Sequence, residues 1–172
     1  MFRSSILSQI AEAYEPYLGL IRQMFHKYCS GTLEEFMEEC DVYKLQRPVF
    51  ESYFEKGFCE RTEQILIDEV EYEQERMRNS IVTMLQKLSE IRPVVIVLNR
   101  FQLASKSTMQ LSNSLLQVKN KNIGIVLGVN DVQSIPEFAH EEWDAIMIFF
   151  RYAMLISCSL PISFASATPL EK

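Results

Sequence analysis

Two short runs of apolar, β-branched residues in the second half of the chain each end in polar side chains. The first run ends at Leu98 and is followed by Asn99, Arg100 and Gln102, and the second is followed by Asn130. Ligands of parallel α/β sheets bind beyond the carboxyl ends of the strands. If the protein has a small-molecule site, we therefore expect these four polar residues to mark it.

A helix is expected directly after the first run, beginning at Ser105. Arg100 and Lys106 would lie near its N-terminus, where exposed N–H groups favour negative charge. These two residues could therefore hold an anion. In the alternative that we favour, Arg100 extends into solvent and the hydroxyl of Ser105 simply caps the helix.

The remaining reactive side chains form no recognisable catalytic or metal-binding pattern. His26 and Cys29 are three residues apart on an expected helix, but two ligands do not make a zinc site, and neither His140 nor the other cysteines supply a second pair. The glutamate pairs 34/35, 38/39 and 141/142 are typical of exposed helix faces. The chain also lacks GxSxG, HExxH and GxGxxG. We predict no catalytic residue, no metal site and no cofactor.

Charge and cysteine content narrow the possible partners. Residues 31–78 hold 14 acidic and six basic residues, and the whole chain has a net charge of −6. Such a surface would repel a phosphate backbone, so we expect no nucleic-acid partner. The four cysteines are scattered without a CxxC pair, as in reduced proteins. With no apolar run long enough to cross a bilayer and no secretory signal, the sequence predicts a cytoplasmic protein that does not contact membranes.

The first half of the chain shows helical periodicity. We expect a helix over residues 4–28, kinked or split at Pro16, and a short helix over 33–43 capped by Thr32. A third helix should open at Arg47-Pro48 and close at Gly57.

The longest helical pattern runs from residue 61 to residue 91. Apolar residues repeat every seven positions along it, at Val70, Met77, Met84 and Ile91. This spacing allows a coiled-coil seam, although Glu73 falls where a core residue should lie. We prefer a long amphipathic helix packed on a sheet, or two helices with a bend.

Strand and helix patterns alternate after Pro93. Residues 94–99 and 123–130 predict strands buried on both faces of a parallel sheet, joined by a helix over 107–118. A helix around Trp143 follows, and the tail could add one short strand. We therefore expect a single α/β domain over 1–172, with a large helical half (1–91) and a βαβ half (92–172). Because no strand is expected before Pro93, a helix or a second copy of the chain should cover the sheet edge.

Residues 92–131 resemble the second half of a P-loop ATPase domain of the AAA-like, STAND-regulator type. In that family, a proline-led apolar strand ends in two acidic residues, the Walker B motif, and a second strand carries a polar sensor residue at its tip. The resemblance places Asn99 and Arg100 at the Walker B positions and Asn130 at the sensor position. It implies an incomplete P-loop-like core, and residues 15–25 and 167–170 are also similar to segments of such regulators.

The chain departs from this family in the residues that bind and hydrolyse nucleotide. It has no GxxxxGK[ST] motif to wrap a phosphate. Asn99 is neutral, and the positive charge of Arg100 would repel Mg²⁺. Because phosphoryl transfer depends on positioning and electrostatic stabilisation, we predict that the protein is not an enzyme and does not bind nucleotide.

Three functional hypotheses follow. The first, which the resemblance implies, is a non-catalytic regulatory or protein-interaction module derived from a P-loop ATPase domain and belonging to a bacterial signalling protein. The second is a helical adaptor that dimerises through residues 61–91. The third is a small-molecule-binding or enzymatic domain with its site at the strand ends, around Asn99, Gln102 and Asn130. For the first two, the partner would be another protein or a second copy of the chain.

Overall fold

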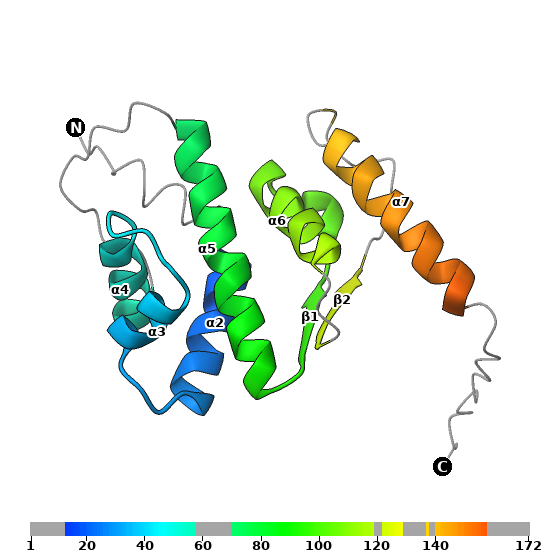
Figure 1. Ribbon diagram of the computed structural model, residues 1–172. Helices are drawn as coiled ribbons and strands as arrows, with labels where there is room; N and C mark the ends of the chain where they lie inside the picture. Colours follow the sequence, from blue (N-terminus) through cyan, green and yellow to red (C-terminus); the bar gives the residue numbers. More distant parts are fainter. Residues whose placement is uncertain (1–12, 58–69, 119–121, 129–136, 138–139, 158–172) are drawn as a thin grey trace, which may run out of the picture.

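The computed structural model of the protein describes residues 13–57, 70–118, 122–128, 137 and 140–157. These residues form a mostly helical α/β structure with a small parallel sheet, as the sequence predicts (Figure 1). No helix in these ranges is both long and apolar enough to span a membrane. The elements are α2 (Glu15–Tyr28), α3 (Leu33–Glu39), α4 (Arg47–Lys56), α5 (Val70–Ile91), β1 (Val94–Leu98), the 3-10 turn η1 (Phe101–Leu103), α6 (Lys106–Gln117), β2 (Ile123–Leu127) and α7 (His140–Ser157).

Local sequence signals set the boundaries of α3 and α4. Thr32 and Glu35 form a capping box at the start of α3, each side chain bonding the other's backbone N–H. Helix α4 starts at Arg47 with proline in its first turn and ends at Gly57, whose φ of 80° favours glycine. Helix α3 ends earlier than expected, because Asp41 adopts a left-handed backbone with φ of 51° just beyond it.

Whether Pro16 kinks or splits the helix expected over residues 4–28 stays a prediction, because residues 13 and 14 form a turn and the described helix, α2, begins only at Glu15. Pro16 lies in the first turn of α2, where its missing N–H costs no helical hydrogen bond. The part of the expected helix before residue 13 lies outside the described residues.

Helix α5, with 22 residues, corresponds to the long amphipathic helix expected over residues 61–91. Residues 61–69 of that expected helix lie outside the described residues. Two of the four positions that repeat every seven residues, Met77 and Met84, are fully buried within the chain's own core. The other two, Val70 and Ile91, are exposed near the helix ends.

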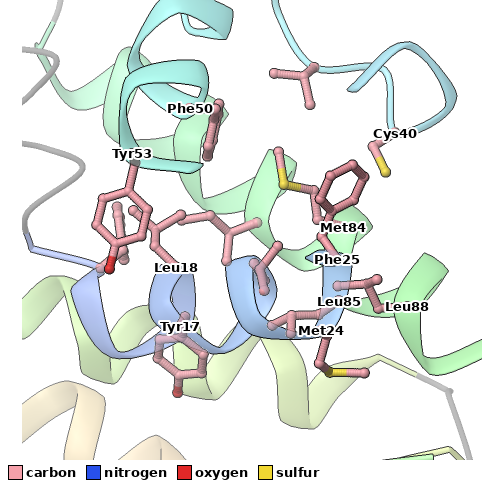
Figure 2. Close-up of a cluster of buried hydrophobic side chains, with 14 of the residues drawn as sticks. Tyr17, Leu18, Met24, Phe25, Cys40, Phe50, Tyr53, Met84, Leu85 and Leu88 are labelled. Carbon is pink, nitrogen blue, oxygen red and sulfur yellow. The ribbon is translucent and has the colours of Figure 1, made fainter. Parts of the chain in front are cut away.

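The main hydrophobic core surrounds α2, which packs against both α4 and α5 (Figure 2). A large apolar side chain in this core stabilises the fold by about 1.5–3 kcal/mol when it is fully buried. The side chains around α2 include Tyr17, Leu18, Met24 and Phe25 from α2 itself, Phe50 and Tyr53 from α4, and Met84, Leu85 and Leu88 from α5.

The two strands pair in parallel and in register, with Val94 opposite Ile123 and Leu98 opposite Leu127. Helix α6 connects them, so the predicted βαβ unit is confirmed. The inner face of β1, formed by Val94 and Ile96, is buried in the main core together with apolar residues of α5 and α6. Helix α7 packs on α6 (Figure 1).

The prediction that both faces of the strands are buried is wrong for the described residues. Val95 and Val97 of β1 are 65% and 57% exposed, and Val126 of β2 is 51% exposed. The register places Val95 opposite Gly124 and Val97 opposite Val126, so these residues share one face, which we call the open face. An unbroken apolar run cannot reveal this difference, because burial depends on which elements pack on each face.

Two further predictions lie outside the described residues. One is the short strand in the tail after residue 157, and the other is the segment that would carry the sensor-like Asn130. The covering of the sheet edge stays a prediction.

Candidate functional site at the strand ends

The carboxyl ends of β1 and β2 are joined by backbone hydrogen bonds. The N–H of Gly128 donates to the carbonyl of Leu98 at 2.8 Å, and the N–H of Phe101 donates to the carbonyl of Gly128 at 2.9 Å. Arg100 adopts a left-handed backbone, with φ of 54°, that turns the chain into η1. The turn after β1 therefore folds over the end of β2. A Cβ atom at position 128 would lie only 2.9 Å from Oδ1 of Asn99, which shows how closely the two ends approach.

The predicted site residues have three different environments. Asn99 and Arg100 lie on the turn after β1 and are exposed to solvent. Gln102 follows on the same turn, but its side chain is buried and only 5% exposed. Asn130 lies outside the described residues. The structure thus brings Asn99, Arg100 and Gln102 to one sheet end, while only the first two offer their side chains to solvent.

Gln102 has a carboxamide oxygen that lacks a hydrogen-bond donor among the described residues. A buried acceptor without a partner is costly, so Oε1 needs a donor from water, from a ligand or from elsewhere in the chain. This atom is the feature at the strand ends that most clearly favours a small polar ligand.

Ser105 acts as the helix cap that we favoured. Its hydroxyl oxygen accepts a hydrogen bond from the backbone N–H of Thr108 at 3.1 Å. The hydroxyl of Thr108 in turn donates to the carbonyl of Ala13 at 2.8 Å. The first turn of α6 is therefore used to anchor the chain that leads into α2.

Lys106 points to α7 and forms an ion pair with Glu142, at 3.4 Å between Nζ and Oε1. Gln110 donates to the same carboxylate oxygen at 3.0 Å, and Arg78 of α5 donates to Gln110 at 3.3 Å. A chain of polar contacts thus links α5, α6 and α7. Because Lys106 is paired with Glu142, these contacts favour the alternative in which Ser105 only caps α6 over the alternative in which Arg100 and Lys106 hold an anion.

The prediction that both members of the 141/142 glutamate pair are exposed is wrong for Glu142. Its side chain is buried next to Trp143, whose ring lies 6.2 Å from that of Phe101. The second carboxylate oxygen, Oε2, has no partner among the described residues. Glu142 lies four residues before the fully buried Ile146, so both residues share the helix face that is buried.

Glu73, which interrupts the seven-residue pattern of α5, is also buried. Its carboxylate accepts hydrogen bonds from Gln46 at 3.0 Å and from Arg76 at 3.1 Å. The guanidinium of Arg76 lies between the rings of Tyr43 and Tyr72, at 4.0 and 4.1 Å from their centroids. This group joins α5 to the start of α4 and has a structural role.

The described cysteines and His26 show no catalytic arrangement. Burial raises the pKa of the Cys40 thiol to about 12, and burial together with the nearby Glu39 raises the pKa of Cys29. Both thiols therefore stay protonated at neutral pH. Nε2 of His26 lies 3.2 Å from the carbonyl oxygen of Phe54. Among the described residues, no three His, Cys, Asp or Glu side chains gather as a metal site requires.

The residues at the end of β1 do not fit a magnesium nucleotide. Mg²⁺ is held through carboxylates, whereas this strand end carries the amide of Asn99 and the positive charge of Arg100. The carboxylate oxygen Oε1 of Glu142 on α7 is held by Lys106 and Gln110. The exposed groups at this end are suited to hydrogen bonding.

Comparison of the chain with protein-family models, with curated protein sequences and with solved structures found no match. The likeness to P-loop ATPases therefore remains a resemblance in the pattern of residues 92–131.

Proposed function

We propose that the protein is a non-catalytic regulatory or protein-interaction module related to P-loop ATPase domains and belonging to a bacterial signalling protein. The observation that carries this proposal is the end of β1. A parallel βαβ unit supports the relationship, yet the positions that would hold Mg²⁺ are Asn99 and Arg100. The neighbouring cation, Lys106, is paired with Glu142. Among the described residues, this strand end therefore carries no carboxylate that could hold Mg²⁺ beside a phosphate.

The open face of the sheet supports the interaction part of the proposal. Parallel sheets are usually covered on both faces, and exposed apolar patches mark protein-interaction surfaces. Here Val95, Val97 and Val126 stand side by side without cover from the described residues. The partner would be another protein or a second copy of the chain.

The contacts of α5 argue against the helical-adaptor alternative. A coiled-coil dimer would need Met77 and Met84 to face a second chain. Both side chains are instead fully buried against the chain's own helices.

The small-molecule alternative is favoured by one specific observation, the unpartnered Oε1 of Gln102. Native mass spectrometry of the purified protein tests it. A bound metabolite that is lost in Gln102→Leu, but kept in the matched control Gln117→Leu at the exposed C-terminal end of α6, would support this alternative over the interaction module.

Assays of ATP hydrolysis and of nucleotide binding by equilibrium dialysis test the main proposal. We expect neither activity in the presence of Mg²⁺. Light scattering over a range of concentrations then distinguishes the two kinds of partner. Self-association that Val97→Lys abolishes would identify a second copy, while a monomer at all concentrations would leave a different protein as the partner.

A further inference from the structure

A surface groove of about 470 Å³ lies in the helical half, where the C-terminal ends of α2 and α5 meet α3. Its apolar base is formed by Phe25 and Phe36, whose rings are 5.1 Å apart and nearly buried. Tyr28 and Ile91 also line the groove and are 39% and 49% exposed. The groove therefore offers apolar surface to an incoming side chain, in a volume typical of binding sites.

Acidic side chains line the same groove. Glu35 and Glu39 come from α3 and Glu90 from α5, while Lys87 is the single basic residue among the lining residues. Hydrogen bonds from the backbone and side chain of Thr32 lower the pKa of Glu35, which keeps this carboxylate charged. The charge changes sign near Tyr28, because Lys27 and Arg92 lie over its ring, 5.1 and 5.8 Å from the centroid.

We propose that this groove binds a segment of a partner protein in which an apolar side chain is flanked by lysine or arginine. The apolar side chain would pack on Phe25, Phe36 and Ile91, and the basic residues would lie beside Glu39 and Glu90. Complementary charge fixes the orientation of such a segment and speeds its association.

Charge also selects this occupant over two others. A second copy of the chain would bring a net charge of −6 toward the acidic side of the groove. A nucleic acid would be repelled in the same way. The proposal concerns a different surface from the open face of the sheet, so it can fail without affecting the function proposed above.

Fluorescence anisotropy with the full chain tests the proposal. The probe is a fluorescein-labelled peptide built from a repeated Lys-Lys-Leu-Leu unit, used near physiological ionic strength. A second peptide with serine in place of leucine keeps the charge and removes the apolar side chains. We expect the leucine peptide to bind at least about tenfold more tightly than the serine peptide, because only the former can fill the apolar base.

Substitutions in the groove distinguish specific binding from general attraction to an acidic protein. Glu39→Lys, Glu90→Lys and Ile91→Ser should each weaken binding of the leucine peptide by about tenfold. The matched control is Glu51→Lys on the exposed face of α4, which makes the same charge change outside the groove and should alter affinity by less than about twofold. Circular dichroism checks that each variant is folded.

Peptide-induced shifts of the amide resonances of Tyr28, Cys29 and Ile91 in NMR spectra give a second measurement that needs no substitution. The proposal is overturned if the peptide does not bind, if Glu51→Lys weakens binding as much as Glu39→Lys, or if the serine peptide binds equally well. It is also overturned if the shifts fall on other residues, or if the peptide fails to bind because a second copy of the chain occupies the groove.

Discussion

Val97 and Val126 are register partners on the two parallel strands, and both side chains are more than half exposed. On β1, the side chains of Val94 and Ile96 face the opposite way from that of Val97 and are almost completely buried. One strand therefore separates a core face from an open face, and this asymmetry can be measured.

Matched substitutions on β1 should reveal the two faces. Threonine keeps the shape and the β-branching of valine but adds a hydroxyl group. Val94→Thr places that hydroxyl in the core and should lower the free energy of unfolding by about 1–3 kcal/mol. Val97→Thr should change it by less than about 0.5 kcal/mol. Urea unfolding measures both values, and an equal loss at position 97 would mean that the open face is covered within the chain.

The left-handed backbone of Arg100, with φ of 54°, is sterically unfavourable for a residue that has a Cβ atom. Glycine adopts this backbone without the steric penalty of a Cβ atom, so Arg100→Gly should raise the free energy of unfolding by about 0.5–1 kcal/mol. Arg100→Ala also removes the charge but keeps the penalty, and it should give no gain. A comparison of the two variants by thermal unfolding separates backbone strain from charge. Equal stability of the two variants would show that the turn is not strained.

Glu142 is a buried carboxylate with one oxygen lacking a partner among the described residues. Replacing a buried charge with an apolar side chain of similar size is often neutral or stabilising. Glu142→Met should therefore leave the free energy of unfolding within about 1 kcal/mol of the original or raise it. Lys106→Met should lower it modestly, because Lys106 is half exposed while Glu142 would lose its cation. Chemical denaturation measures the free energy of unfolding of both variants, and we expect the value for Glu142→Met to be the higher. A large decrease in Glu142→Met would reveal a further partner of Oε2.

Alkaline pH should destabilise the protein partly through Cys40. Burial raises the pKa of its thiol from 9.0 to about 12, and burial raises that of Tyr17 from 10.0 to about 12. The stability that these groups contribute is complete below pH 9. It is lost as the pH rises toward 12, because the unfolded chain releases the protons first. The urea midpoint should decrease between pH 7 and a pH above 9, and the decrease should be smaller in Cys40→Ala than in the original chain. An equal decrease in the two proteins would contradict the burial of the thiol.

The sequence predicted those features that local chemistry decides. The cap at Thr32, the left-handed end at Gly57 and the cap at Ser105 follow from which side chains can satisfy helix ends, and the structure confirms all three. The pairing of the two strands followed from their length, their β-branched content and the helix between them.

The features that were missed depend on contacts between distant elements. The sequence placed Gln102 at the end of β1 but could not tell that its side chain turns into the core. It assigned Glu142 to an exposed face because the adjacent glutamates resemble a solvated helix, whereas the packing of α7 on α6 buries it. Likewise, the exposure of Val95 and Val97 reflects helices packing on only one face of the sheet in the described chain.

Thermal unfolding with and without Mg-ATP tests the central claim most directly, namely that the end of β1 does not bind nucleotide. A ligand at 100 times its dissociation constant would stabilise the folded state by about 2.7 kcal/mol, which amounts to several degrees for a protein of this size. We predict no change in the unfolding temperature at millimolar Mg-ATP, either for the original chain or for Arg100→Ala. A rise of several degrees in the original chain would contradict the claim.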